Sequence, residues 1–254
     1  VAYGLVEQGV TLLIHSGSRG LGHQVCDDAL HGMLAAATRY GIELPDRQLC
    51  AAPLSSPEAQ DYFAAMACAI NFAFANRQVM TDAARRALAR FFGGRDEARL
   101  ELVYDVCHNI AKWEHHQVDG ATRRLCVHRK GATRAFGPGH PDVPERYRDV
   151  GQPVLVPGDM GRYSFVLKGQ TGAMLESFGS CCHGAGRRLS RVKAKQLASR
   201  RPILQELRKQ GVFVRADSKN TVAEEIPDAY KDVADVVGVV AGAGLAGLVA
   251  KLVP

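Results

Sequence analysis

Pro153-Val-Leu-Val156, followed by Pro157-Gly-Asp-Met-Gly161, is the stretch that decides the fold. A short apolar run that stops at a turn rich in Gly and Pro is typical of a buried strand whose loop is exposed. The same pattern of an apolar run before a loop or turn predicts further short strands at Gln8–His15, Leu100–Val106, Leu125–His128 and Val212–Val214. The sequence therefore predicts strands that each deliver a polar loop.

Apolar residues elsewhere recur at intervals of three and four, which predicts helices. Two helices are expected between Leu21 and Phe92, and Ser56 with Pro57 provides the cap and first residue of the second. Further helical segments are expected at 185–210 and from Tyr230 onward. We therefore predict an α+β fold, one mixed domain over residues 1–254 with a helical insertion at about 21–95.

Composition limits the class of protein. The 254 residues carry a net charge of +6, which permits nucleic acid or phosphorylated ligands, and the 46% hydrophobic content is that of a folded chain. The longest uncharged apolar stretch, Val236–Ala250, is shorter than a membrane helix of roughly 20 residues. Seven cysteines, with Cys181 and Cys182 adjacent, suit a reducing, cytoplasmic setting better than a disulfide framework. Because the chain begins at Val1, we expect it to be incomplete at the N-terminus.

Four histidines stand at loop junctions beside small or polar residues: His15, His108, His128 and His183. Imidazole titrates near neutral pH and serves as a metal ligand, a base or a nucleophile. A lone histidine of this kind is more often structural, but four at strand ends favour a functional site.

Three loops have the composition of a phosphate site. His15–Gly22 combines glycines with Arg19, and His128–Arg134 holds Arg129, Lys130 and Arg134 around one glycine. The turn at Pro157–Gly161 can present backbone N–H groups and a carboxylate to a ligand. The alternative for each is an ordinary solvated turn.

His183-Gly-Ala-Gly-Arg-Arg188 is the most informative segment. Small residues at the start of a predicted helix leave N–H donors open to a phosphate. A neutral imidazole beside them can attack a nucleotide α-phosphate if cations such as Arg187 hold the phosphates. The alternative is a glycine-rich helix cap.

Six motifs in this order resemble the RtcB-type RNA ligases, and the resemblance spans nearly the whole chain. The motifs are His15-Ser-Gly-Ser-Arg-Gly-Leu-Gly-His-Gln24, His108-Asn109 with Ala111-Lys112, His128-Arg-Lys-Gly-Ala-Thr-Arg-Ala-Phe136, Pro157-Gly-Asp-Met-Gly161, Cys182-His-Gly-Ala-Gly-Arg187 and Ala229-Tyr-Lys-Asp232. The resemblance implies the C-terminal part of an RtcB-type catalytic fold.

The resemblance also implies an activity. GTP guanylylates a histidine, the guanylate passes to an RNA 3′-phosphate or 2′,3′-cyclic phosphate end, and a 5′-hydroxyl attacks to release GMP, with manganese as the metal. Such a ligase serves tRNA splicing and RNA repair, with tRNA halves or broken RNA as substrates and an archease-type protein as activator.

By position, the resemblance makes His183 the nucleophile and His15 and His108 manganese ligands. The positions implied to bind the guanylate are His108, Asn109, Pro157, Gly158, Asp159, Met160, Ser164, His183, Gly184, Ala185, Gly186 and Tyr230. Charge and location alone suggest five cations for RNA phosphates or the triphosphate: Arg19, Arg129, Lys130, Arg134 and Arg187.

The chain departs from the family pattern in two places. Asp159 stands where Ser is more usual, and its carboxylate could accept hydrogen bonds from guanine but would repel phosphate. The family's Asp and Cys metal ligands, its Asn-His segment and its final Lys have no counterpart here, so we expect little ligation by these 254 residues alone. Two alternatives remain: a non-catalytic RNA- or nucleotide-binding remnant, and a metal-dependent phosphohydrolase that uses His15 and His108.

Overall fold

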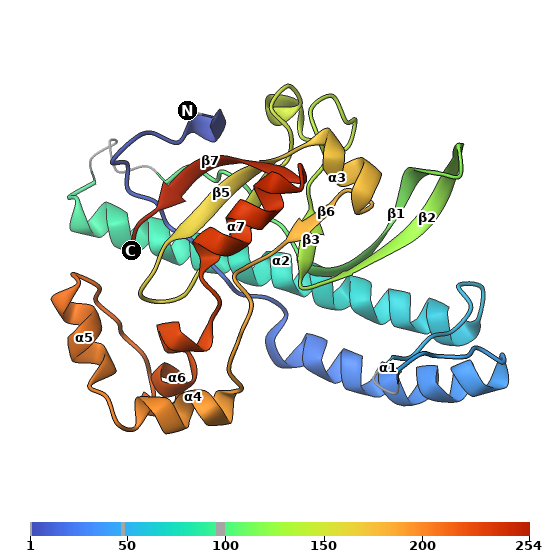
Figure 1. The fold of residues 1–254 in the computed structure, drawn as a ribbon, viewed down its shortest axis with the longest axis horizontal. Helices are drawn as coiled ribbons and strands as arrows, with labels where there is room; N and C mark the ends of the chain where they lie inside the picture. The colour runs from blue at the N-terminus through green and yellow to red at the C-terminus, as the bar shows by residue number, and fades with distance from the viewer. Residues whose placement is uncertain (1, 47–48, 95–99) are drawn as a thin grey trace. The chain divides into compact units, whose positions relative to one another are not determined.

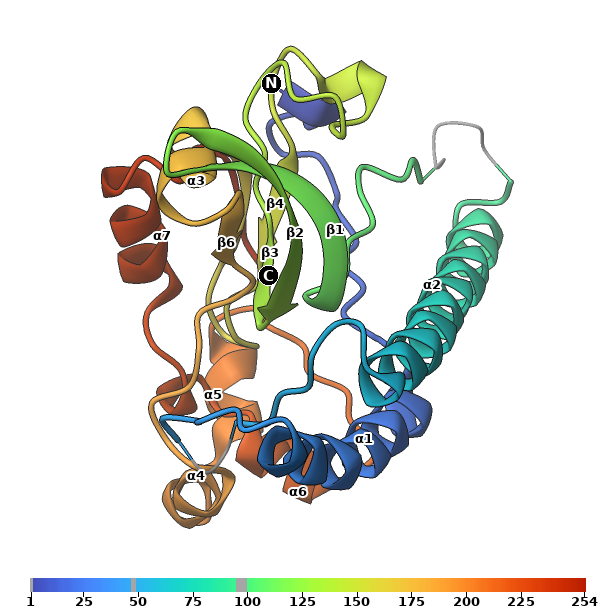
Figure 2. The same ribbon diagram turned by 90° about the vertical axis from the view of Figure 1, so that its right-hand side faces the viewer.

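The computed structural model describes residues 2–46, 49–94 and 100–254. The contacts divide the chain into two compact units (Figures 1 and 2). The first unit comprises residues 1–11 and 112–254, and the second comprises residues 12–111. The α+β class is confirmed, because helices and small antiparallel sheets both occur. None of the described helices is long and apolar enough to cross a membrane.

The two helices of the second unit are long, and the described helices of the first unit are short. They are α1 (Arg19–Arg39), α2 (Pro57–Phe91), α3 (Thr171–Glu176), α4 (Arg191–Ala198), α5 (Ile203–Lys209), α6 (Lys219–Glu224) and α7 (Val233–Gly242), with short 3-10 turns at Ala2–Gly4, Glu145–Tyr147 and Pro227–Ala229. The strands are β1 (Asn109–Val118), β2 (Ala121–Lys130), β3 (Ala132–Arg134), β4 (Pro153–Val156), β5 (Ser164–Gly169), β6 (Ser180–Cys182) and β7 (Ala246–Leu252).

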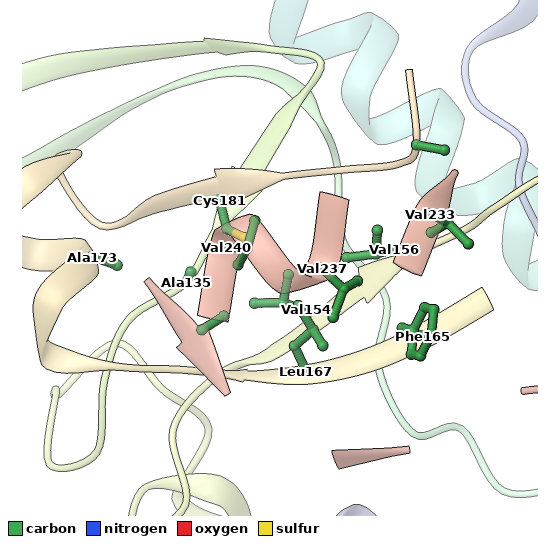
Figure 3. Close-up of a cluster of buried hydrophobic side chains, with 12 residues drawn as sticks. Ala135, Val154, Val156, Phe165, Leu167, Ala173, Cys181, Val233, Val237 and Val240 are labelled. Carbon is green, nitrogen blue, oxygen red and sulfur yellow. The ribbon is translucent and has the colours of Figure 1, made fainter. Parts of the chain in front are cut away.

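A three-stranded antiparallel sheet, β4-β5-β7, holds the main core of the first unit. Val154 and Val156 of β4 and Leu167 of β5 are fully buried, and α7 packs Val237 and Val240 against them (Figure 3). Apolar side chains on alternate positions of β4 therefore face α7, as a period of two requires. This sheet presents the β4–β5 turn, residues 157–163, at its end.

Two smaller sheets complete the strands of the first unit. β3 pairs with β6, with Ala132 opposite Cys182, and β1 pairs with β2 as a hairpin. Gly131 is the one residue between β2 and β3, and its φ of +65° is a conformation that glycine adopts readily. The chain therefore passes from the hairpin directly to the strand that pairs with β6.

In the second unit, α1 packs against α2 through small residues. Ala36 and Ala37 of α1 are buried, as are Ala69 and Ala73 of α2. Ser56 caps α2 by accepting a hydrogen bond from the Ala59 N–H at 3.2 Å, and Pro57 is its first residue, which confirms the predicted start of this helix.

Several predicted elements are wrong. Residues 8–15, 100–106 and 212–214 form no strand. Side chains of α2 bind the second of these segments instead of a partner strand, with Arg85 donating to the Leu100 carbonyl at 3.0 Å. Pro202 separates α4 from α5, so the helix predicted at 185–210 is broken and begins only at Arg191. The predicted strands at 125–128 and 153–156 are confirmed.

Truncation of the main core should cost considerable stability. Leu167→Ala removes a fully buried side chain and should lower the free energy of unfolding by about 2–5 kcal/mol. Leu248→Ala is the control, because Leu248 is the cross-strand partner of Leu167 but is 56% exposed. Chemical denaturation measures both, and equal losses would contradict this description of the core.

Candidate active site

His183 follows β6 and lies beside the glycine that joins β2 to β3. The pairing of Ala132 with Cys182 brings the two loops together, and His183 Nδ1 is 2.7 Å from the Gly131 carbonyl oxygen. A carbonyl only accepts, so Nδ1 carries a proton, and in the neutral ring the lone pair is on Nε2. A Cβ on Gly131 would lie 3.4 Å from His183 Cε1, so glycine also allows this close approach.

The adjacent cysteines, Cys181 and Cys182, have opposite pKa shifts. A hydrogen bond from Cys181 lowers the pKa of Cys182 to about 7 against the effect of burial, with help from the Gly184 backbone. The same hydrogen bond, together with burial, raises the pKa of Cys181 above its usual range. A thiol with a lowered pKa therefore precedes His183, which the sequence analysis did not anticipate.

The His183–Gly186 loop packs against the β4–β5 turn. The Ala185 N–H donates to the Pro157 carbonyl at 3.1 Å, and a Cβ on Gly184 would lie 3.3 Å from that same oxygen. The structure corrects one prediction here, because the loop is not the start of a helix: α4 begins at Arg191, where Ser190 is the cap. Any phosphate bound by this loop would therefore contact loop N–H groups and not a helix N-terminus.

Asp159 has its partners within the turn. Its carboxylate accepts from the N–H groups of Gly161 and Arg162 at 3.0 and 3.1 Å, and from Arg162 Nε at 2.6 Å. Arg162 also lies 3.3 Å from an oxygen of Asp232. The fully buried Asp159 side chain is thus neutralised locally, and its role is to shape the turn. The sequence analysis missed Arg162, which the spacing Asp-x-x-Arg could have indicated.

Ser164 and Tyr230 complete the predicted guanylate positions in this unit. Ser164 Oγ accepts from the Gly158 N–H at 3.3 Å. The Tyr230 hydroxyl binds Glu225 and receives a hydrogen bond from Arg187 Nη1 at 3.0 Å, while the Lys231 N–H donates to the Gly186 carbonyl at 3.0 Å. Burial and the neighbouring Glu225 carboxylate raise the pKa of Tyr230. Residues 157–164, 183–186 and 230 therefore form one loop cluster, which we call the nucleotide loops after the role predicted for them from the sequence.

The predicted phosphate-binding cations of the first unit differ in environment. Arg187 pairs with Glu225 at 3.0 Å, and Arg134 pairs with Asp142 at 3.4 Å. Lys130 is exposed. Arg129 is 2% exposed and cannot reach an RNA phosphate in this conformation, which corrects its predicted role.

The Arg129 guanidinium instead holds three segments together. It forms a bidentate pair with Glu114 of β1 at 2.8 Å and donates to Ser180 Oγ at 2.9 Å and to the Phe178 carbonyl at 2.8 Å. His116 Nε2 is 3.0 Å from the same carboxylate. Burial raises the pKa of Glu114, but the hydrogen bonds from Arg129 and His116 outweigh it, and the pKa is lowered.

In the second unit, the two predicted manganese ligands face each other. His15 Nε2 and His108 Nε2 are 3.1 Å apart, with the ring planes at 82°. Two imidazole nitrogens this close can share one cation. Among the described residues, however, no group of three or more His, Cys, Asp or Glu side chains could hold a metal. The pair therefore fits part of a metal site and needs further donors.

Arg77 of α2, which the sequence analysis missed, ties together the segments that carry these histidines. It is 8% exposed, pairs with Asp105 at 2.6 Å and donates to the Ser16 carbonyl at 3.2 Å. Arg19 and Asn109 are both exposed in the same unit. The fold thus brings His15 and His108 together across 93 residues of sequence through contacts with one helix.

The family model described as "tRNA-splicing ligase RtcB" matches residues 1–254. The tRNA-splicing ligase RtcB of Archaeoglobus fulgidus is 54% identical over 253 residues, which are 99% of this chain and 52% of that relative. Those of Thermococcus kodakarensis and Methanococcus maripaludis are 54% and 49% identical over 100% and 99% of this chain, and 53% of each relative is covered.

Both comparisons point to one class of protein, ligases that are described as splicing tRNA. The chain belongs to the RtcB family. It spans about half the length of each of these three relatives.

Removal of Arg129 should be strongly destabilising. Arg129→Ala leaves the Glu114 carboxylate buried without its bidentate partner, which should cost about 3–5 kcal/mol. Arg123→Ala, which changes an exposed residue of the same strand, should cost little. Urea titration at neutral pH distinguishes them.

The contribution of Glu114 should also depend on pH. Because folding lowers the pKa of Glu114, its contribution is complete above the ordinary value of 4.5 and is lost as the pH falls through the folded pKa. The difference in stability between the wild type and Glu114→Gln should therefore shrink in acid. A constant difference from pH 7 to pH 3 would contradict this assignment.

Cys182 should be the more reactive of the two adjacent thiols. The rate of its alkylation by iodoacetamide, followed by peptide mapping, should rise with a midpoint near pH 7, because the thiolate is the nucleophile. Cys181→Ala removes the thiol donor and should move the midpoint upward. A midpoint at the ordinary value of 9.0 in the wild type would refute the assignment.

Proposed function

We propose that this chain contributes the nucleophile and nucleotide loops of a GTP- and manganese-dependent RNA ligase. The observation that carries the proposal is the hydrogen bond between His183 Nδ1 and the Gly131 carbonyl at 2.7 Å, in a chain that belongs to the RtcB family. The printed name of the relatives, tRNA-splicing ligase, supports an RNA substrate.

In this proposal, His183 Nε2 attacks the α-phosphorus of GTP. A P–N bond forms, the bond to the bridging oxygen breaks, and pyrophosphate leaves with the displaced electron pair. The Gly131 carbonyl keeps Nδ1 protonated, holds the ring in one tautomer and stabilises the positive charge that the ring gains on attack.

Two displacements follow in the proposed reaction. An oxygen of the RNA 3′-phosphate attacks the guanylate phosphorus and releases His183. The RNA 5′-hydroxyl then loses its proton and attacks the activated 3′-phosphate, which forms the new phosphodiester and releases GMP. RNA 3′-phosphate ends are thus joined to 5′-hydroxyl ends. A 2′,3′-cyclic phosphate end enters the same sequence after water attacks its phosphorus and breaks the bond to the 2′-oxygen, which leaves a 3′-phosphate and a 2′-hydroxyl.

The nucleotide loops support guanylate binding through their backbone. Gly184 and Gly186 have no side chains to block a phosphate, and Tyr230 presents an aromatic ring beside Arg187. Asp159, which Arg162 neutralises, positions the turn and does not contact phosphate in this proposal. Asn109 remains a proposed guanylate contact of the second unit.

His15 and His108 are proposed to hold manganese together with further donors. The 3.1 Å separation of their Nε2 atoms supports this role. When bound, the metal would neutralise charge on the phosphates. Arg19, Lys130, Arg134 and Arg187 are the cations proposed for RNA phosphates or the triphosphate.

The test is covalent labelling of the full-length protein with α-labelled GTP and manganese. Wild type should retain acid-labile label, typical of a P–N bond, and His183→Ala should retain none. His31→Ala is the matched control, because His31 is an exposed histidine of α1 outside the proposed site and outside the six motifs. Chelation of manganese should abolish labelling of the wild type.

Each contrary result has a distinct meaning. Persistent labelling of His183→Ala would refute the nucleophile. Salt-sensitive RNA binding without any guanylate adduct would favour a non-catalytic RNA-binding protein. Release of phosphate from a 3′-phosphorylated oligonucleotide without GTP would favour a metal-dependent phosphohydrolase.

A further inference from the structure

The β1–β2 hairpin is a sheet of two strands that extends from the rest of the first unit (Figures 1 and 2). Asp119 and Gly120 form its two-residue turn, both with positive φ, 51° and 76°. This turn matches the twist of the strands and fixes the register of a hairpin.

The two faces of the hairpin differ in burial. On β1, Glu114 and His116 are buried. Trp113, which precedes them, and His115, which lies between them, are exposed. Contacts across the strands confirm which residues share the exposed face: Gln117 Nε2 donates to Thr122 Oγ1 at 2.6 Å, and the Arg124 guanidinium lies 4.6 Å from the centre of the Trp113 ring. Between Trp113 and Lys130, the exposed residues of this outer face are Trp113, His115, Gln117, Thr122, Arg124, His128 and Lys130.

The outer face is cationic. It carries Arg124 and Lys130 and no carboxylate, and the structure describes every residue of the hairpin. The one carboxylate within its strands, Glu114, is on the opposite face and is bound by Arg129. A polyanion can therefore approach the outer face without repulsion from the strands.

The outer face also offers a ring for stacking. Trp113 is 47% exposed although Arg124 lies against it. An indole with an adjacent guanidinium is suited to stacking a nucleobase, and cations beside it can bind the flanking phosphates. Since Trp113 is the one large apolar side chain in the set, the face suits a nucleic acid better than an apolar protein surface.

We infer that the outer face of the β1–β2 hairpin is a docking surface for single-stranded RNA. Trp113 stacks on a base, and Arg124 and Lys130 bind phosphates on either side of it. This surface runs directly to the proposed nucleophile, because Lys130 precedes Gly131, whose carbonyl binds His183 Nδ1. The inference rests on the proposed function in that the docked strand would deliver its end to His183.

The test measures binding of a labelled single-stranded RNA with a 3′-phosphate to the full-length protein without GTP. Trp113→Ala should weaken binding about tenfold, and Trp113→Phe should retain most of the affinity because the ring still stacks. Arg124→Gln with Lys130→Gln should reduce the dependence of binding on salt by about one to two counterions.

Phe213→Ala is the matched control. Phe213 is 79% exposed in the same unit and lies beside Arg208 at 5.6 Å, so it offers the same pair of side chains outside the hairpin. Phe213→Ala should bind RNA as wild type does. Equal affinity of Trp113→Ala and wild type, or an equal loss in Phe213→Ala, would overturn the inference.

A guanylylation assay of the same variants tests the proposed function independently of the docking surface. Trp113→Ala should take label from GTP as wild type does, since the substitution does not touch the nucleotide loops. Loss of RNA binding with labelling intact supports the docking surface. If wild type took no label, the proposed function would fail, while the RNA affinities would still decide whether the outer face binds RNA.

Discussion

The buried contact between Arg129 and Glu114 connects most of the features described above. Arg129 is a residue of β2, and its guanidinium binds Glu114 of β1 and the Phe178 carbonyl in the chain before β6. It therefore joins three segments. Two residues beyond Arg129, Gly131 turns the chain into β3, which pairs with β6 and places His183 against the Gly131 carbonyl. Because a buried guanidinium is costly without its partners, this contact is made only when all three segments are in place. The position of the proposed nucleophile thus depends on an ion pair that never touches a substrate.

The same contact determines which face of the hairpin is exposed. Successive side chains of a strand point to opposite faces, so burial of Glu114, His116 and Arg129 turns their neighbours outward. Trp113 and Lys130 are among those neighbours. The negative charge of Glu114 lies on the inner face, where Arg129 neutralises it, and the outer face carries Arg124 and Lys130 without a carboxylate. One buried pair therefore orients the histidine and also keeps the one carboxylate of the two strands away from the outer face.

The sequence predicted the local elements better than their partners. Pro57 and Ser56 mark the start of α2, and the apolar run at 153–156 is β4, because caps and short apolar runs act within a few residues. The apolar runs at 8–15 and 100–106 are not strands, since a strand needs a partner that no local pattern specifies. Strand β7 was missed although Gly242 ends α7 and Gly244 precedes the strand, because its glycine and alanines have little of the β-branched or alternating pattern of a strand. Asp159 was expected to face a ligand, but its contact with Arg162 depends on the shape of the turn. The histidines, in contrast, were recognisable from residue type and from the resemblance, although their contacts were not.

Only some of the Lys and Arg residues behind the net charge of +6 are available to attract a polyanion. Arg77, Arg129 and Arg162 are each bound to a carboxylate, so these cations stabilise loops and strands and add little to an exposed positive surface. Positive charge that can attract a polyanion comes instead from exposed residues such as Lys130, Arg124 and Arg19. An excess of six charges is small beside 32 Lys and Arg, and its location decides what the protein binds. In the first unit, the residues that the Arg129–Glu114 pair turns outward place part of that excess beside the proposed nucleophile, where RNA phosphates would have to lie.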